Sequence, residues 1–369
     1  MHIQRGAWAE INLDAVAHNV QMAKANLKPT TKLCAVVKAD AYGHGAVRVA
    51  QEAARNGADF FAVALLQEGV KLREAGIEKP ILVLGSMLPE VAEICVRYDI
   101  SHAVFDEERL YALNAAALKL HTKAKIHIKI DTGMHRIGVH VRDAGRFAKL
   151  AASLPGIYIE GVFSHFATAD ADDKQYAAYQ FERFQEALRL IEAEGVHIPI
   201  RHIANSAALT ELQEYQLDMV RQGITLYGLH PAHMIDCYKD FEPVMTVKTQ
   251  VAFVKTLPPG ETIGYGRTYT LTRPSVIATV PIGYADGFNR HLGCGHGEVW
   301  INGKRVPTVG NICMDVCMVD VTDVACREGD SVEIFGDHLP VTVLSDQLDT
   351  IPYEVLTGIS NRVKRVYYL

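Results

Sequence analysis

The sequence predicts an α/β protein, with an N-terminal (β/α)8 TIM-type barrel and a C-terminal mainly-β domain. Two observations lead to this prediction. Short apolar runs alternate with helical patterns from about residue 11 to residue 240, and β-like runs separated by tight turns occupy residues 241–369. Residues 1–10 are predicted to form a strand that associates with the C-terminal domain.

Eight apolar runs predict the barrel strands, and helical patterns such as AVRVAQEAARNG separate most of them. The runs are TKLCAVVK, DFFAVAL, PILVLG, SHAVF, KIHIKID, IYIEGVFSH, IRHIANS and LDMVRQG. Parallel strands need crossover connections, which are usually helices, so eight such units indicate a closed barrel. An open doubly wound sheet is the alternative, because SHAVF is a weak strand pattern.

The C-terminal part is predicted to be mainly β because its apolar runs lie between turn sequences. TVKTQVAFVKTL, SVIATVPIGY, GEVWINGKRVPTV, CMVDVTDV and DSVEIFG are separated by PPG, DG, NG and EGD. A helix is predicted only near the end, at PYEVLTGIS, and the boundary with the barrel is placed near HPAHMIDCYKDFEP.

Composition and charge narrow the class of protein. A chain of 369 residues with 49% hydrophobic and 22% charged residues is typical of a globular protein, and its net charge of −6 argues against nucleic acid as a partner. The N-terminus has no long apolar run, so we expect no membrane segment and a cytoplasmic location. Seven scattered cysteines indicate reduced thiols, and the absence of zinc-type spacing predicts no metal site.

Polar side chains gather at the carboxyl ends of the predicted strands, which is the end of a barrel that carries catalytic residues. These residues are Lys38, Lys129, Asp131, Arg136, His165, Asn205, Ser206 and Arg221. Charges that only decorate a surface would be scattered over both ends of the barrel and over its helices. The pattern therefore predicts a functional site at the barrel mouth.

A phosphorylated ligand is predicted at this mouth because the last two strand ends carry phosphate-binding features. Ser206 begins a predicted helix, and the backbone amides of Gly223 and Ile224 can approach an anion closely. Taken singly, Ser206 is better explained as a helix N-cap and Gly223 as a turn residue. Lys38 follows a buried run and precedes a Gly-rich loop, and such a lysine opposite a phosphate site suggests pyridoxal 5′-phosphate (PLP).

A series of motifs runs in order along most of the chain, beginning with AVVKADAYGHG at residues 35–45. It continues with KIDTGMHRIG, SHFATAD, ANSAA, MVRQGITLYG, GYGRTY, PIGYADGF, NICMDV and YEVLTGISNRVKRVY. These motifs resemble those of the alanine racemase family, in which the first contains the PLP lysine. The resemblance implies a barrel plus a β-domain, PLP as the cofactor, alanine as the substrate, and a homodimer whose active sites combine both subunits.

The resemblance implies two catalytic bases. Lys38 would hold PLP as a Schiff base and act as one base, and Tyr265 of the other subunit would be the second. Racemisation removes the Cα proton from one face and returns a proton to the other, so two opposed bases suffice without moving the substrate. An amine and a phenol have ordinary pKa values of about 10.4 and 10, and their surroundings must lower both values. The alternative for Tyr265 is an ordinary turn tyrosine in GYG.

The resemblance also implies which side chains hold the cofactor. Arg221 would face the pyridine nitrogen, His165 would pack near the ring, and Arg136 would contact the phenolic oxygen. The phosphate would be held by Tyr42, Ser206, Gly223, Ile224 and Tyr353, and Asn205 would lie next to that cluster. Arginine does not give up its proton, so Arg221 cannot keep the ring nitrogen protonated as a carboxylate would. The weaker electron sink suits a racemase better than a decarboxylase.

The remaining residues implied by the resemblance concern the substrate and its access. Lys129 would be carbamylated by CO₂ and would orient Arg136, with an ordinary ion pair to Asp131 as the alternative. The substrate would lie near Arg136, Met314 and Asp315, and the entry channel would contain Tyr284, Arg290 and Asp170. Members of the family often carry Arg where this chain has Asn311, and this departure could alter access or affinity.

The function implied is interconversion of L-alanine and D-alanine, which serves cell-wall peptidoglycan or alanine catabolism. A racemase of broader or serine specificity would share the same motifs. A related PLP decarboxylase would need an acidic partner at the ring nitrogen, where Arg221 stands. A non-catalytic PLP-binding barrel protein would lack the long β-domain predicted at residues 241–369.

Overall fold

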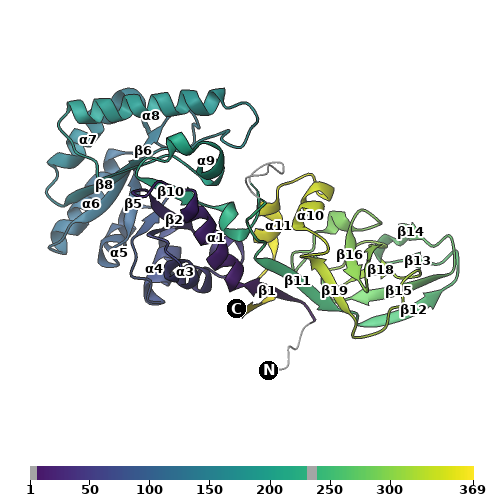
Figure 1. Ribbon diagram of the computed structural model, residues 1–369. Coiled ribbons are helices and arrows are strands. Elements are labelled where there is room, and N and C mark those ends of the chain that lie inside the picture. Colours follow the sequence, from purple (N-terminus) through teal and green to yellow (C-terminus); the bar gives the residue numbers. More distant parts are fainter. Residues whose placement is uncertain (1–5, 231–238) are drawn as a thin grey trace. The chain divides into compact units, whose positions relative to one another are not determined.

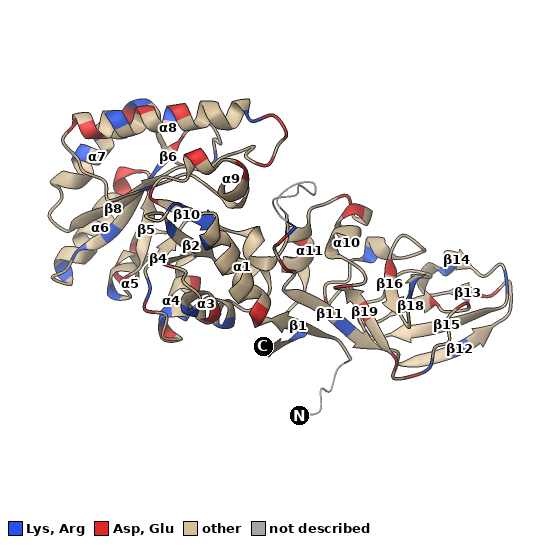
Figure 2. Cartoon of the chain, viewed as in Figure 1, with Lys and Arg blue, Asp and Glu red and all other residues tan. Residues whose placement is uncertain are grey.

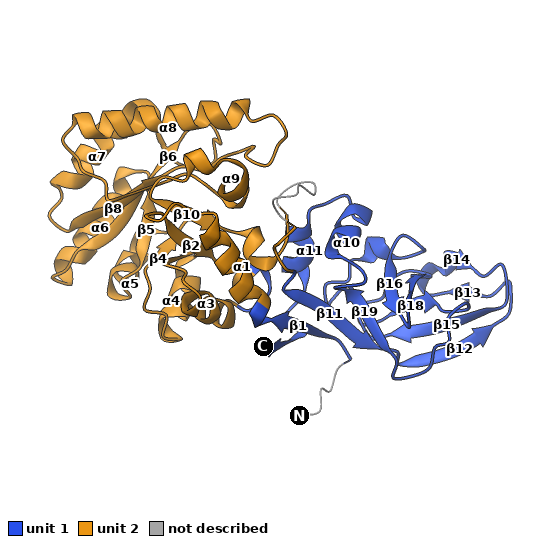
Figure 3. Ribbon diagram, viewed as in Figure 1, with its two compact units in different colours: residues 1–14, 42–45, 243–369 blue, residues 15–41, 46–242 orange. Residues whose placement is uncertain are grey.

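The computed structural model describes residues 6–230 and 239–369, which divide into two compact units (Figure 3). Unit 1 comprises residues 1–14, 42–45 and 243–369, and unit 2 comprises residues 15–41 and 46–242. Two short segments predicted within the barrel range, residues 11–14 and 42–45, thus belong to unit 1. Most of the predicted junction HPAHMIDCYKDFEP, including Cys237, lies outside the described residues.

Unit 2 is a nearly closed barrel of eight parallel strands, and each predicted run contains one of them (Figure 1). The strands, in the order in which they pair, are β10 (Met219–Gln222), β2 (Lys32–Val36), β3 (Phe60–Val63), β4 (Ile81–Val83), β5 (Ser101–Val104), β6 (Ala124–Asp131), β8 (Ile157–Phe163) and β9 (Ile200–His202). The short strand β7 (Val139–His140) pairs with β6. Two backbone hydrogen bonds of 3.1 Å, Asp218 N to Arg201 O and Arg221 N to Ala204 O, link β9 to β10. The predicted barrel is therefore confirmed, and the alternative of an open doubly wound sheet is not found among the described residues.

Helices follow the strands along the chain, and all the predicted helical patterns contain one. They are α3 (Ala46–Arg55), α4 (Leu66–Glu74), α5 (Ala92–Arg97), α6 (Glu107–Lys119), α7 (Ala144–Ser153), α8 (Gln175–Ala193) and α9 (Ser206–Glu211). The helix α1 (Leu13–Ala25) was not predicted, although its Val16, Val20 and Ala23 are fully buried. Basic and acidic residues are interspersed along α8 (Figure 2). Within the described ranges, no helix is long and apolar enough to cross a membrane.

The segment α2 (Lys38–Tyr42) is a left-handed turn directly after β2. Ala39, Asp40, Ala41 and Tyr42 all have φ between 51° and 55°. L-residues pay roughly 1–2 kcal/mol each for this conformation, so the turn needs outside support. The Ala39 amide donates to Glu68 Oε1 at 2.6 Å, and Asp40 Oδ1 accepts from the amide of Ala46 at 3.1 Å. These bonds hold the backbone immediately after Lys38.

A bulge between β6 and β8 brings a carboxylate into the barrel. Ile126 pairs with Ile159 and His127 pairs with Gly161, so Glu160 is the extra residue. Bulges re-aim side chains, and here the carboxylate of Glu160 lies 3.1 Å from His127 Nε2. A Cβ added to Gly161 would clash with the His127 ring, so only glycine leaves room for this contact.

Unit 1 is mainly β, as predicted. Its six-stranded sheet has the order β17 (Lys304–Pro307), β16 (Glu298–Ile301), β19 (Ser331–Phe335), β11 (Met245–Gln250), β1 (Trp8–Asn12) and β20 (Lys364–Tyr368). Strand β1 therefore lies between two C-terminal strands, antiparallel to β11 and parallel to β20. A second sheet contains β12 (Phe253–Leu257), β15 (Ser275–Val280) and β18 (Cys317–Asp320), and a small ribbon contains β13 (Thr262–Ile263) and β14 (Tyr269–Thr270). Helix α11 (Pro352–Gly358) was predicted, whereas α10 (Val341–Gln347) was not.

Candidate active site

Cationic side chains from several strand ends surround His165 at the barrel mouth. Burial and the charges of Arg221, Lys129, Arg136 and Lys38 lower the pKa of His165 well below its usual range. The five side chains are electrostatic neighbours, although they are far apart in the sequence. Four basic side chains around a neutral imidazole give the barrel mouth a positive potential that suits an anionic ligand.

The guanidinium of Arg221 is fixed by acceptors at the ends of two strands, β8 and β9. Nη1 lies 2.8 Å from His202 Nδ1, and Nη2 lies 3.0 Å from His165 Nδ1. Nη2 also donates to the backbone carbonyls of Ser164 at 2.9 Å and Ile203 at 3.0 Å. Burial lowers the pKa of Arg221 to about 10, so the group stays protonated at neutral pH. Among the described residues, no carboxylate lies within 4 Å of it.

A hydrogen-bonded relay connects Arg221 to a distant carboxylate. His202 Nε2 lies 2.9 Å from His127 Nδ1, and His127 Nε2 lies 3.1 Å from Glu160. Because Arg221 can only donate, His202 Nδ1 must accept, and a neutral imidazole then carries its proton on Nε2. His127 Nδ1 must accept in turn, which puts the His127 proton on Nε2, facing Glu160. The hydroxyl of Ser101 also donates to Glu160. Along the relay, every hydrogen bond is donated in the direction from the Arg221 cation to the Glu160 anion.

The ring of Phe163 lies beneath this cluster. It stacks on His202 with ring centroids 4.9 Å apart and an interplanar angle of 5°. The cationic groups of Lys129 and Arg221 lie 5.4 and 5.5 Å from its centroid. The aromatic face gives both cations a favourable contact without a counter-ion.

Lys129 is a buried amine with few polar contacts. Its Nζ donates to Ile130 O at 2.7 Å and lies 3.5 Å from Ser164 Oγ. Burial and the charge of Arg221 lower its pKa to about 7, while Asp131 acts in the opposite direction. The predicted alternative, an ion pair with Asp131, is not seen, because the Asp131 carboxylate instead faces His135 Nδ1 at 3.0 Å. A large share of the Lys129 amine is therefore uncharged at neutral pH.

Lys38 is the first residue of α2 and directly precedes its four left-handed residues. Its side chain is half-buried. Burial, together with the charge of Arg136, lowers the pKa of the Lys38 amine, whereas Glu68 raises it. The amine is thus more easily deprotonated than a surface lysine, as a nucleophile or base requires.

The loops after β9 and β10 are joined through Ser206. Its hydroxyl accepts a 2.8 Å hydrogen bond from the Gly223 amide and lies 3.2 Å from Thr225 Oγ1. The simpler interpretation of Ser206 as an N-cap is wrong, because Asn205 caps α9 by accepting from the Ala208 amide at 3.1 Å. Ser206 and Gly223 therefore meet, as the phosphate-site prediction requires.

The other predicted residues lie in unit 1, apart from Ile224, which is buried in the turn after β10, and Asp170 in the loop after β8. Tyr42 and Tyr353 are in contact, with ring centroids 6.0 Å apart, and burial raises the pKa of Tyr42. Tyr265 is 72% exposed and Met314 is 52% exposed. Asp315 is held by Arg362, whose Nη2 donates to its Oδ1 at 2.5 Å.

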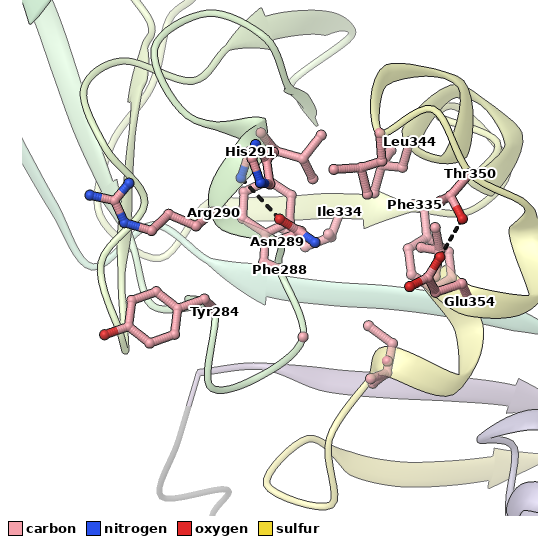
Figure 4. Close-up of a pocket in the computed structure, with 16 residues that line it drawn as sticks. Tyr284, Phe288, Asn289, Arg290, His291, Ile334, Phe335, Leu344, Thr350 and Glu354 are labelled. Carbon is pink, nitrogen blue, oxygen red and sulfur yellow. Dashed lines mark hydrogen bonds between the residues drawn. The ribbon is translucent and has the colours of Figure 1, made fainter. Parts of the chain in front are cut away.

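Tyr284 and Arg290 line the same pocket of unit 1, which has a volume of about 700 Å³ (Figure 4). Asn289 caps the turn that contains Arg290 by accepting from the His291 amide at 2.9 Å. Apolar side chains such as Phe335 form much of the remaining wall. The two predicted entry-channel residues thus lie close together, beside an apolar pocket.

Sequence reasoning missed the relay residues His127, His202 and Glu160. Two of them left a signal: His127 stands two residues before Lys129 in KIHIKID, and His202 lies within IRHIANS. Alternate residues of a strand share a face, so both histidines could have been placed inside the barrel. Glu160 could not, because the bulge shifts it out of the strand alternation.

The fold and the site define a (β/α)8-barrel protein with a cationic site at the barrel mouth and a second, mainly-β unit. The alanine racemase N-terminal domain model matches residues 11–231, and the C-terminal domain model matches residues 244–367. The chain is 46% identical over 365 residues to the alanine racemase of Desulfovibrio desulfuricans, covering 98% of each chain. The alanine racemase structure of Clostridium difficile 630 superimposes with a TM-score of 0.96 at 40% identity, covering 100% of this chain and 97% of that one. An alanine racemase structure from Bacillus anthracis, with bound L-Ala-P, gives a TM-score of 0.95 at 37% identity, covering 100% and 96%. This chain belongs to the alanine racemase family.

Glu160→Gln should destabilise the fold by roughly 1–3 kcal/mol at neutral pH, because an amide replaces the anion that ends the relay. Burial alone would raise the pKa of Glu160, but the hydrogen bonds from His127 and Ser101 outweigh burial and lower it. A carboxyl group whose pKa is lowered in the folded state stabilises the fold at pH values above its unfolded pKa of about 4.3. This contribution is lost as the pH falls through the folded pKa. Urea unfolding of both proteins at neutral and acid pH measures this difference, which should shrink in acid.

Glu93→Gln is the control, since the Glu93 carboxylate only makes exposed ion pairs with Arg97 and Lys119. It should leave the free energy of unfolding nearly unchanged. A Glu160→Gln difference that is absent, or that is equally large at both pH values, would contradict the relay.

Proposed function

We propose that this chain interconverts L-alanine and D-alanine with PLP as its cofactor. The observation that carries the proposal is that Lys38, at the end of β2, shares the barrel mouth with the buried Arg221, whose guanidinium is fixed by His202 and His165. The relatives named as alanine racemases, which align over nearly the whole chain, support the same reaction.

The donor set of the barrel mouth fits PLP. A ligand with a phosphate, a phenolic oxygen and a pyridine nitrogen offers acceptors to all the cationic groups there. Lys38 would hold the cofactor covalently, and Arg221 would donate to the ring nitrogen. Ser206 and the Gly223 amide, already 2.8 Å apart, would bind the phosphate together with Ile224, Tyr42 and Tyr353. When bound, PLP withdraws electrons from the amino acid and so makes its Cα–H acidic.

Arg221 would restrain that electron withdrawal. Because its guanidinium donates and keeps its proton, it would leave the ring nitrogen unprotonated. The relay to Glu160 holds the guanidinium in its donating orientation. This restraint would suppress transamination and so favour removal and return of the proton at Cα.

Lys38 and Tyr265 would move the Cα proton on opposite faces of the substrate. The lowered pKa of the Lys38 amine prepares it to accept a proton on one side. Tyr265, whose side chain is 72% exposed, would enter from the other side. Arg136, Met314 and Asp315 would bind the substrate, and Tyr284, Arg290 and Asp170 would line its entry.

A homodimer would complete each active site, with Lys38 from one subunit and Tyr265 from the other. The exposure of Tyr265 and Met314 in unit 1 supports an arrangement in which a second copy covers them. The enzyme would act in the cytoplasm, where it would supply D-alanine for cell-wall peptidoglycan or serve alanine catabolism.

Incubation with L-alanine and PLP, followed by chiral chromatography, should yield D-alanine and approach a 1:1 mixture. Lys38→Ala should abolish turnover and the visible absorption of the bound cofactor. Tyr265→Phe should keep that absorption but slow turnover by about 10²–10⁴-fold, as expected for loss of a general acid–base group.

Tyr158→Phe, which removes the hydroxyl of an exposed tyrosine on the barrel, is the matched control and should retain activity. Full activity of Tyr265→Phe would overturn the two-base assignment. Formation of CO₂ from amino acids in place of D-alanine would overturn the racemase assignment.

Lys129 should carry a carbamate under CO₂-containing buffer. Its amine loses its proton at a pKa of about 7, attacks CO₂ and releases a proton, which replaces a positive charge with a negative one beside Arg136. Native mass spectrometry should find one added CO₂, with an occupancy that rises with pH through about 7 and disappears on acidification.

Lys125, on the same strand, is half-buried and paired with Asp99 at 2.7 Å, and it should remain unmodified. An active enzyme whose Lys129 is unmodified at every pH would contradict the carbamate.

A further inference from the structure

The loop that carries Tyr265 has little support of its own. It joins β13 to β14, which pair through only two residues each. Gly264 and Gly266 flank the tyrosine with φ of 72° and 77°, and Arg267 also has a positive φ. Flexible residues in a short ribbon leave the position of the phenol to contacts from elsewhere in unit 1.

Asn311 supplies such contacts through both ends of its amide. Its Nδ2 donates to the backbone carbonyl of Tyr265 at 2.7 Å and to Thr268 Oγ1 at 3.2 Å. Its Oδ1 accepts from Arg290 Nη1 at 3.0 Å. One half-buried side chain thus joins the Tyr265 loop to the turn that contains Arg290.

The chemistry of these partners fixes the orientation of the amide. Tyr265 O can only accept and Arg290 can only donate. A flipped amide would place oxygen against oxygen at Tyr265 and N–H against N–H at Arg290. Asn311 therefore presents both of its N–H groups to the loop and its oxygen to Arg290, and no other uncharged orientation satisfies all three partners.

We propose that Asn311 is a positioning residue, whose amide N–H groups hold the Tyr265 loop and so fix where the phenol is presented. This inference rests on the proposed function of Tyr265 as a base. Proton transfer depends steeply on the placement of the base, so a loosened loop slows the chemical step while substrate still binds. Arg290, at the predicted entry, is held through the same side chain.

Asn311→Asp is the sharpest test, because it keeps the shape and the acceptor but removes both donors. Hydrogen exchange of the peptide covering residues 262–270 should accelerate in the purified full-length protein. In the PLP-loaded enzyme, kcat should fall by about tenfold, because a less firmly placed base transfers the proton more slowly, with KM within about twofold.

Asn311→Arg keeps a hydrogen-bond donor at this position but changes the shape of the side chain. A guanidinium can donate to Tyr265 O but cannot accept from Arg290. The Arg variant should therefore retain a kcat within about threefold of the original protein, although it is the larger change in volume. Equal loss of kcat in the Arg and Asp variants would overturn the donor argument.

Asn302→Asp is the matched control. The Asn302 amide also donates two hydrogen bonds in unit 1, to Ala325 O at 2.8 Å and Asp330 Oδ2 at 2.7 Å, away from the Tyr265 loop. This variant should leave exchange at 262–270 and kcat unchanged. Unchanged exchange in Asn311→Asp, or faster exchange with an unchanged kcat, would overturn the proposal. If the original protein does not racemise alanine, the proposed function fails, and exchange at 262–270 alone then decides whether Asn311 clamps the loop.

Discussion

The buried guanidinium of Arg221 is the constraint on which the barrel site depends. A charged group in the barrel interior must find acceptors, and here two imidazole nitrogens and two carbonyls supply them. Because arginine only donates, its presence dictates the tautomers of His165 and His202, and through His202 that of His127. Arg221 thereby determines which ring nitrogen of each histidine carries the proton.

The charge of Arg221 is balanced at a distance. Its anion is Glu160, two histidines away, so the carboxylate stabilises the cation without approaching the place where a ring nitrogen would bind. The β8 bulge and Gly161 make this separation possible. Lys129 reduces the remaining positive charge, since its lowered pKa leaves much of its amine neutral. The backbone strain of the left-handed turn after Lys38 is offset by hydrogen bonds that the carboxylates of Glu68 and Asp40 accept from backbone amides.

The barrel could be predicted because its eight strands are continuous apolar runs separated by helical patterns. The site was predictable where a polar residue ends such a run, as for Lys38 and Arg221. The left-handed turn was not, because none of the residues after Lys38 up to Tyr42 is a glycine. The position of Glu160 could not be predicted because it lies in a bulge. The contacts of Asn311 could not be predicted because they join loops that are far apart in the sequence. Backbone irregularities and long-range polar pairs leave no periodic signal.

The protonation state of His202 tests the central claim most directly. Burial and the Arg221 charge lower its pKa well below the usual range, and the relay puts its single proton on Nε2. Nitrogen-15 NMR of histidine-labelled protein, assigned with His202→Gln, distinguishes the two tautomers and the cation. The structure predicts a neutral His202 near neutral pH, with a proton on Nε2 and none on Nδ1. A cationic His202, or one with its proton on Nδ1, would contradict the relay that holds Arg221.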